Sequence, residues 1–332
     1  MKLLVTGGLG FIGSNFIKNI LENYTNYSII NLDDERYGSN HLSLTSLKNS
    51  NNYKFVKGNI CDTELCKKLV SESDVVINFA AESHVDRSIL NSKPFMDSNI
   101  IGVHNILEQI KLHKKRLIQI STDEVFGSLE NESADEKFKL NSSSPYASSK
   151  ASAELIVNSY VKTYECDCII TRCTNNYGPH QFPEKLIPKT LLLAENNQKI
   201  PIYGTGENIR DWIHVNDHCN AIIDVLHKGK TGESYNISAN NEIDNITIVK
   251  KILSLMDKSE ELIEFVEDRP GHDFRYSMDS RKISKEIGWE IKSSFDKGLE
   301  KTIQWYLDNP DILNEISSTV LDSTPWKSSN KL

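Results

Sequence analysis

The sequence predicts an α/β protein with a Rossmann-type, doubly wound parallel sheet and a smaller, mixed α/β C-terminal domain. Short apolar runs alternate with helical patterns through the first half of the chain, as strands and their covering helices do in such sheets. Two runs, Leu3-Leu4-Val5 and Val75-Val76-Ile77, are apolar at consecutive positions, which is typical of strands buried on both faces. A glycine-rich turn separates the first run from the first helical pattern.

The expected elements alternate up to about Arg172. Strands are predicted at Leu3–Thr6, Ser28–Leu32, Tyr53–Val56, Val75–Ala80, Leu117–Ser121 and Cys168–Arg172. Helices are predicted at Phe11–Asn23, Met96–His113, Tyr146–Tyr164 and, near the C-terminus, Phe295–Leu307. We therefore expect residues 1–172 to form the Rossmann domain, with a later stretch, roughly 208–222, returning to it. Residues 173–332 mainly form the second domain, because Asn175–Pro188 carries three prolines and the pattern changes there.

Composition excludes several classes of protein. The 332 residues are 38% hydrophobic and 25% charged, with a formal net charge of −8 and no basic stripe, which argues against a nucleic-acid partner. No apolar stretch approaches the roughly 20 residues that span a bilayer, so we expect no membrane association. The six cysteines lack metal-ligand spacing, and no signal peptide is visible. We expect reduced thiols, no metal and a cytoplasmic location.

The glycine-rich turn predicts a dinucleotide site. Gly7, Gly10 and Gly13 follow the first strand and open a helix, where backbone N–H groups can approach a pyrophosphate closely. Asp33 ends the second strand, and an acid at that position accepts hydrogen bonds from the adenosine ribose. Asp33 favours NAD over NADP because it repels a 2′-phosphate, although Arg36 lies nearby.

A tyrosine and a lysine four residues apart predict hydride chemistry. Tyr146 and Lys150 begin a helix after Pro145, and this spacing puts both side chains on one helix face. We expect the ammonium, together with the positive nicotinamide ring, to lower the pKa of the tyrosine. The phenolate can then remove a hydroxyl proton while hydride leaves the same carbon.

With these motifs the chain resembles the extended short-chain dehydrogenase/reductase superfamily and, within it, the nucleotide-glucose 4,6-dehydratases. The resemblance runs over essentially the whole chain. It is carried by the runs Ala80–Ser88, Ser121–Gly127, Asn175–Pro179, Phe182–Leu186, Arg210–Trp212 and Asp268–His272.

An adjacent acid pair separates a dehydratase from its relatives. Once C4 of a glucose is a ketone, elimination of water needs one base at C5 and one acid at the C6 hydroxyl, and neighbouring carboxyls can differ in pKa. The resemblance implies that Glu124 is the base, that Asp123 is the acid, and that Thr122 hydrogen-bonds the C4 oxygen. The product would be a 4-keto-6-deoxy sugar, an early step of deoxysugar synthesis such as that of rhamnose.

The resemblance also implies the binding residues, position by position. The coenzyme set is Gly7, Gly10, Phe11, Ile12, Gly13, Asp33, Asn59, Ile60, Ala80, Ala81, Ser98, Tyr146, Lys150 and Asn176. The substrate set is Ser83, Thr122, Asn175, Lys185, Leu186, Pro201, Tyr203, Arg210, Asn245, Arg269 and His272. Lys185 and Arg210 are the expected pyrophosphate partners, and Pro201 with Tyr203 is expected to flank the base.

Three positions depart from the family pattern. Phe126 replaces a common tyrosine, Asn59 stands where an aspartate near the adenine is frequent, and Asp34 follows Asp33 where lysine or a neutral residue is commoner. The amide oxygen of Asn59 can still accept a hydrogen bond.

Three alternatives remain open. The nucleotide is dTDP or UDP: Arg210–Trp212 and Ala81–Ser83 resemble the dTDP-glucose enzymes more, whereas His180–Phe182 is similar to the UDP type. A 4-epimerase or decarboxylase would keep the glycine loop and the Tyr/Lys pair without the acid pair, and a non-catalytic NAD-binding scaffold would lose Tyr146 or Lys150. Family members are usually homodimers joined through the Tyr/Lys helix, so the resemblance implies a homodimer, with Val157, Tyr160 and Val161 available for the contact.

Overall fold

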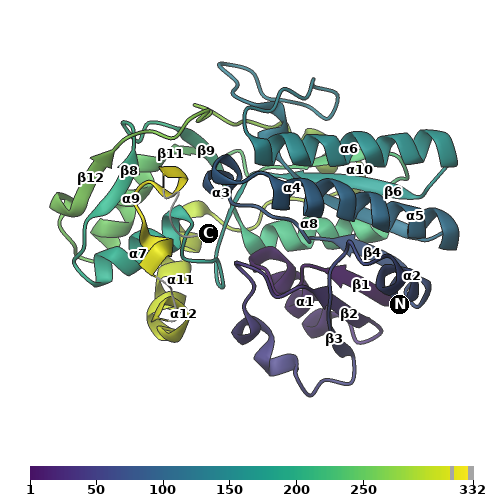
Figure 1. The fold of residues 1–332 in the computed structure, drawn as a ribbon. Helices are drawn as coiled ribbons and strands as arrows, with labels where there is room; N and C mark the ends of the chain where they lie inside the picture. Colours follow the sequence, from purple (N-terminus) through teal and green to yellow (C-terminus); the bar gives the residue numbers. More distant parts are fainter. Residues whose placement is uncertain (315–317, 328–332) are drawn as a thin grey trace.

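In the computed structural model, which describes residues 1–314 and 318–327, a seven-stranded sheet forms the centre of the protein (Figure 1). Every neighbouring pair is parallel, in the order β10-β6-β5-β4-β1-β2-β3. The strands are β1 (Lys2–Thr6), β2 (Ser28–Asp33), β3 (Tyr53–Lys57), β4 (Val75–Asn78), β5 (Arg116–Thr122), β6 (Cys168–Cys173) and β10 (Ser234–Ile237). The predicted doubly wound sheet is confirmed.

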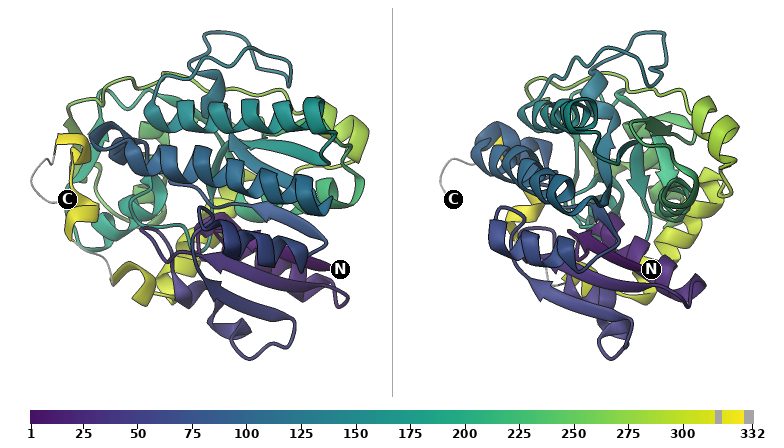
Figure 2. Two further views of the ribbon diagram at one scale, coloured as in Figure 1. Left: turned by 45° about the vertical axis from the view of Figure 1, so that its right-hand side comes forward. Right: turned by 90° about the vertical axis from the view of Figure 1, so that its right-hand side faces the viewer.

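Helices cover both faces of this sheet (Figure 2). Alternate residues of β1 point to opposite faces: Leu3 and Val5 pack with α1 and α8, whereas Leu4 packs with α2, α5 and α6. All three of these side chains are at most 1% exposed, as the run of consecutive apolar residues predicted. The covering helices are α1 (Phe11–Asn23), α2 (Thr63–Ser71), α5 (Val103–His113), α6 (Pro145–Tyr164), α8 (Val215–Lys228) and α10 (Arg281–Ile287).

The helix predicted at Met96–His113 is not continuous. A short helix α4 (Lys93–Met96) runs into a π-helical turn at Asp97–Gly102 before α5 begins. Asn99 in this turn donates to the hydroxyl oxygen of Ser149 at 2.9 Å and accepts from the backbone N–H of Glu82 at the same distance. Periodicity alone does not predict a π-turn, because tertiary contacts of this kind decide where the extra residue lies.

The C-terminal part carries two small sheets and its own core. One sheet has the order β11-β9-β7 and the other pairs β12 with β8. Tyr177, Trp212 and Leu299 lie in the core between them and the surrounding helices. The strands are β7 (Asn175–Tyr177), β8 (Ile200–Tyr203), β9 (Ile209–His214), β11 (Glu242–Asp244) and β12 (Ile263–Val266); the helices are α7 (Leu186–Glu195), α9 (Asn245–Leu255), α11 (Phe295–Asp308) and α12 (Asp311–Asn314).

Short helical turns complete the chain. Helix α3 (Val85–Leu90) follows β4, and 3-10 turns lie at η1 (His41–Leu47), η3 (Asp123–Phe126), η4 (Glu260–Leu262), η5 (Ser318–Leu321) and η6 (Pro325–Lys327). Among the described residues, none of the helices combines the length and apolar character that crossing a bilayer requires.

Candidate active site

The first cavity lies at the carboxyl ends of β1, β2, β4, β5 and β6, where doubly wound sheets bind ligands. Its volume is about 320 Å³, within the range of small-molecule sites. The glycine loop forms one wall. A Cβ atom on Gly7, which has φ +71°, would lie 2.5 Å from the backbone nitrogen of Ala80, and one on Gly13 would lie 2.5 Å from the carbonyl oxygen of Gly7. Only glycine fits either position.

The N-terminus of α1 faces this wall. Gly10 is its N-cap and offers no side-chain hydrogen bond to the first turn, so the free N–H groups and the helix dipole are available to an anion. The loop and the helix together suit the pyrophosphate of a dinucleotide. The residues present therefore fit the coenzyme that the sequence predicts.

Asp33, predicted to bind the adenosine ribose, also makes hydrogen bonds within the protein. Its Oδ2 accepts a hydrogen bond from the backbone N–H of Leu9 at 3.0 Å, and its Oδ1 accepts from the Ser39 hydroxyl at 2.8 Å. The carboxylate therefore holds the glycine loop in place besides lining the cavity. Asn59 is more constrained than expected. Its amide oxygen accepts from the backbone N–H of Cys61 at 2.7 Å, and its amide nitrogen donates to Asp34 at 2.8 Å.

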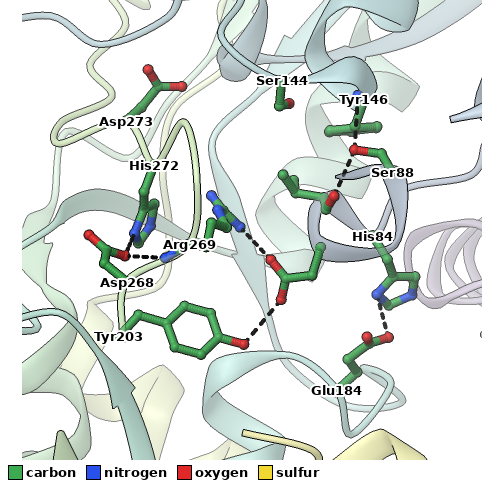
Figure 3. A network of polar contacts seen from close by, with 12 residues as sticks. His84, Ser88, Ser144, Tyr146, Glu184, Tyr203, Asp268, Arg269, His272 and Asp273 are labelled. Atoms are coloured by element: carbon green, nitrogen blue, oxygen red, sulfur yellow. Dashed lines mark hydrogen bonds and ion pairs between the residues drawn. The ribbon is translucent and has the colours of Figure 1, made fainter. Parts of the chain in front are cut away.

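Tyr146 and Lys150 line the same cavity from the first turns of α6. Ser144 caps this helix by accepting from the backbone N–H of Ala147 at 3.1 Å. The backbone N–H of Tyr146 donates to Ser88 Oγ on α3 at 3.2 Å (Figure 3). Lys150 Nζ donates to the carbonyl oxygen of Ile120 on β5 at 2.7 Å, so strand and helix are fixed to each other at the reacting centre.

The side chains of the protein do not by themselves lower the pKa of Tyr146, so the expected lowering by Lys150 together with the nicotinamide ring stays a prediction. Burial, followed by the charge of Glu124, raises the pKa of Tyr146 well above its ordinary value. Burial also lowers the pKa of Lys150 to about 8, and its ammonium bonds to the Ile120 carbonyl. A hydrogen bond with Thr122 opposes the rise at Tyr146. A lowered tyrosine pKa thus requires the positive charge of a bound coenzyme.

The acid pair stands where β5 ends and the turn η3 begins. The hydroxyl of Thr122 donates to Asp123 Oδ1 at 3.1 Å and accepts from the backbone N–H of Glu124 at 3.3 Å. The second oxygen of Asp123 is buried and finds no hydrogen-bond partner in the described part of the chain. A carboxyl in that position is stable as the neutral acid, because an unpaired buried charge is costly.

The two carboxyls have different surroundings. Burial and then the charge of Glu124 raise the pKa of Asp123 to about 8, so it carries a proton at neutral pH. Burial also raises the pKa of Glu124, but the positive charges of Arg269, Lys185 and Arg210 oppose that rise. The two carboxyls therefore differ: Asp123 is a protonated acid, whereas the cations near Glu124 favour its charged form.

A second cavity, of about 200 Å³, adjoins the first. Glu124, Asn175 and Lys185 line both, so the acid pair lies at their junction. The wall of the second cavity is held by charges (Figure 3). Arg269 Nη1 donates to Asp86 Oδ1 at 3.2 Å, and the Tyr203 hydroxyl donates to Asp86 Oδ2 at 3.1 Å.

The structure brings every predicted site residue to one of these two cavities. The predicted coenzyme residues all line the first, together with Ser83, Thr122, Asp123 and Glu124. The second is lined by the remaining predicted substrate residues: Leu186, Pro201, Tyr203, Arg210, Asn245, Arg269 and His272. Arg210 is turned towards backbone carbonyls, donating to Asp273 and Phe274 at 2.9 and 3.1 Å. The individual contacts to coenzyme and substrate stay predictions.

Sequence reasoning missed several polar residues of the second cavity. Asp86 joins Arg269 to Tyr203, although more than 100 positions separate it from either partner. His84 Nδ1 lies 2.6 Å from Glu184 Oε2, and both side chains line this cavity. Asp86 and His84 stand inside the motif Ala80–Ser88, but spacing within one motif does not reveal a partner in a distant segment.

Comparison with known proteins agrees with this geometry. The profile of the GDP-mannose 4,6 dehydratase family matches residues 4–302, a stretch that includes the glycine loop, the acid pair and the Tyr/Lys helix. The chain belongs to this family. Low-salt glycan biosynthesis protein Agl12 of Haloferax volcanii is 45% identical over 308 residues, covering 92% of this chain and 99% of that relative.

Two solved structures of this family are similar throughout. The dTDP-glucose 4,6-dehydratase of Bacillus anthracis in complex with NAD is 47% identical, with a TM-score of 0.88, and covers 94% of this chain and 98% of that one. The dTDP-glucose 4,6-dehydratase of Streptomyces venezuelae with NAD and dTDP bound is 40% identical, with a TM-score of 0.92 and the same coverage. The predicted family and fold class are confirmed.

Proposed function

We propose that the chain is an NAD-dependent dTDP-glucose 4,6-dehydratase that forms dTDP-4-keto-6-deoxyglucose and water. The observation that carries this proposal is the divided acid pair. Asp123 holds a proton on a buried carboxyl whose pKa is about 8, while Glu124 lies beside it among three cations. A simple 4-epimerase needs no such donor and base, because it only moves a hydride at C4.

The coenzyme is NAD, as in the similar solved structures. The glycine loop and the α1 N-terminus would hold its pyrophosphate, and Asp33 its adenosine ribose. When bound, NAD accepts the hydride from C4 and supplies it to C6. We assign residues 1–172 to this part of the site, with a later stretch, roughly 208–222, returning to it, and residues 173–332 mainly to the nucleotide sugar. Within that later stretch, α8 packs against α1, whereas β9 joins the small sheet β11-β9-β7.

The protein's own groups manage the protons. Tyr146 takes the proton of the C4 hydroxyl, and Thr122, within hydrogen-bonding reach of Tyr146, orients the C4 oxygen. Glu124 removes the C5 proton of the 4-keto sugar. Asp123 protonates the C6 hydroxyl, which leaves as water as the C5–C6 double bond forms. Glu124 returns a proton to C5 when C6 is reduced.

The proposal also names the nucleotide of the substrate. We favour dTDP because both similar solved structures are dTDP-glucose enzymes; UDP is the alternative. Measuring kcat/KM on dTDP-glucose and UDP-glucose, with the 4-keto product followed by its absorbance in alkali, tests this. A higher value on dTDP-glucose is expected. A higher value on UDP-glucose contradicts the base, and no 4-keto product from either contradicts the dehydratase.

We further propose a cytoplasmic homodimer joined through α5 and α6. Val157 and Tyr160, which the sequence offers for this contact, are only 1% and 7% exposed and pack in the core. In contrast, Leu112 on α5 is 59% exposed, and Leu155 and Tyr164 on α6 are 62% and 51% exposed. Exposed apolar side chains gathered on adjacent helices are typical of an interface. Sedimentation of the wild type and of a Leu155→Asp variant tests this: the wild type should be a dimer and the variant should dissociate. The six free thiols suit a reducing compartment.

A further inference from the structure

The last described segment returns to the second cavity. Residues 318–327 lie beyond the family match, which ends at residue 302, and carry the turns η5 and η6. The turn η6 lies against α3, as the yellow segment beside that helix shows in Figures 1 and 2. Helix α3 contains Asp86, so residues 325–327 lie directly behind the charged wall of the cavity.

The segment is attached to the protein at several points. Lys189 on α7, itself part of the cavity lining, donates from Nζ to the carbonyl oxygen of Asp322 at 2.8 Å. Lys327 pairs with Glu267, two residues before Arg269. Val320 is only 2% exposed. These contacts fix a stretch that would otherwise be a free terminus.

Trp326 makes the contact that reaches the cavity. Its side chain is 8% exposed, and its indole meets the Tyr203 ring edge-to-face, with centroids 4.9 Å apart and planes at 89°. Such contacts restrict both rings. Tyr203 in turn donates to Asp86, which accepts from Arg269. Trp326 therefore supports the wall whose innermost member, Arg269, acts on Glu124.

We propose that residues 322–327 form a strap behind the charged wall of the nucleotide-sugar cavity and that Trp326 is a positioning residue, holding Tyr203, Asp86 and Arg269 in the geometry that binds the substrate. The inference rests on the proposed function, since it concerns the same substrate. Without the indole, Tyr203 gains rotational freedom and water reaches Asp86, which weakens its hold on Arg269. The glycine loop lines the first cavity and not the second, so we expect the pyrophosphate part of the coenzyme site to be unaffected.

The test compares substrate binding in the full-length wild type, Trp326→Ala, Trp326→Phe and a chain ending at Ser323. The direct readout is the Kd of dTDP by calorimetry, beside kcat and KM for dTDP-glucose. We expect Trp326→Ala and the truncated chain to raise Kd and KM by roughly threefold to tenfold with a smaller change in kcat. Trp326→Phe should restore most of the affinity, because a phenyl ring still meets Tyr203.

Trp289→Phe is the matched control. Trp289 is equally buried but lies in the core under the sheet, donating to the carbonyl oxygen of Asp217 at 3.1 Å, so its loss should leave the Kd of dTDP unchanged. A purely structural role for Trp326 would lower the active fraction, and hence kcat, with KM and Kd unchanged; that result overturns the strap. Inactivity of the wild type on dTDP-glucose would instead overturn the proposed function. In that case the comparison of the Kd of dTDP between the wild type and the Trp326 variants still tests the strap.

Discussion

The two cavities are built in opposite ways. One wall of the coenzyme cavity is a single short stretch, Gly7–Gly13, in which a Cβ on Gly7 or Gly13 would clash with neighbouring backbone atoms. The nucleotide-sugar cavity is walled by side chains from distant segments, namely Asp86, Tyr203 and Arg269, joined by hydrogen bonds and an ion pair. The first admits almost no substitution. The second can change by exchanging side chains, and we infer that substrate choice is adjusted there.

The acid pair lies where these two regions meet: Asp123 lines the first cavity, and Glu124 lines both. Asp123 and Glu124 follow the same strand but differ in their surroundings: the charge of Glu124 adds to burial in raising the pKa of Asp123, whereas Arg269, Lys185 and Arg210 oppose the rise at Glu124. The two carboxyls thus lie in the turn η3, directly after β5, where both cavities can be reached. Reacting groups keep their geometry best when a regular element of the fold holds them.

The largest effect should come from breaking this junction. Asp123→Asn keeps the shape of the side chain but removes the proton donor for the C6 hydroxyl. We expect kcat to fall by about 1000-fold, with reduced coenzyme accumulating on the protein after mixing with dTDP-glucose, because C4 oxidation precedes elimination. Rapid-mixing absorbance measures both. Asp224→Asn, which removes an exposed partner of Lys228, should have wild-type turnover; normal turnover of Asp123→Asn would refute its role.

The coenzyme cavity should tolerate even a methyl group poorly. Gly7→Ala puts a Cβ 2.5 Å from the Ala80 backbone nitrogen at φ +71°, so the loop must move away from the pyrophosphate. We expect the affinity for NAD to fall by about 100-fold or more, as a backbone shift of this kind predicts. Gly10→Ala is the comparison, because its Cβ would meet its nearest atom at 3.2 Å and should cost much less. Equal losses of NAD affinity in the two variants would contradict the claim that the close backbone contact at Gly7 shapes the pyrophosphate site.

The nucleotide-sugar cavity should respond in KM alone. Asp86→Asn removes the charge opposite Arg269, and we expect KM for dTDP-glucose to rise by about tenfold with the Kd of NAD unchanged. Asp296→Asn breaks the pair with Lys251, in which Asp296 is 72% exposed, and should change neither constant. A parallel loss of NAD binding in Asp86→Asn would mean that the two regions are not separable.

The smallest effect concerns stability. Burial raises the pKa of Asp123 from 3.8 to about 8. The folded protein therefore favours the protonated carboxyl, and the stability that the neutral acid contributes is fully present below pH 3.8. That stability is lost as pH rises through about 8, because the buried carboxyl then becomes charged. Asp123→Asn should therefore melt with the wild type in acid and a few degrees above it at alkaline pH. Thermal melts across that range measure it. If Asp123→Asn melts below the wild type at alkaline pH, the claim that Asp123 is a buried neutral acid is wrong.

The difference between the cavities also decides how much could be predicted from the sequence. The glycine loop, Asp33 and the Tyr/Lys helix are short motifs whose residue types and spacing have a local structural cause. The sheet and the residues that line the coenzyme cavity could therefore be predicted from the sequence. The partners of Asp86 could not be predicted, because they lie in remote segments. The π-turn at Asp97–Gly102 and the raised pKa of Tyr146 depend on burial and tertiary contacts, which no spacing encodes.

The most direct test of the central claim follows one hydrogen atom. The protein is incubated with dTDP-glucose carrying deuterium at C4, in ordinary water, and the product is examined by NMR and mass spectrometry. A 4,6-dehydratase acting through Tyr146, Glu124 and Asp123 yields a 4-keto-6-deoxy product with the deuterium at C6 and a proton from water at C5. Deuterium that stays at C4 of a hexose, or is lost to water, would contradict the account.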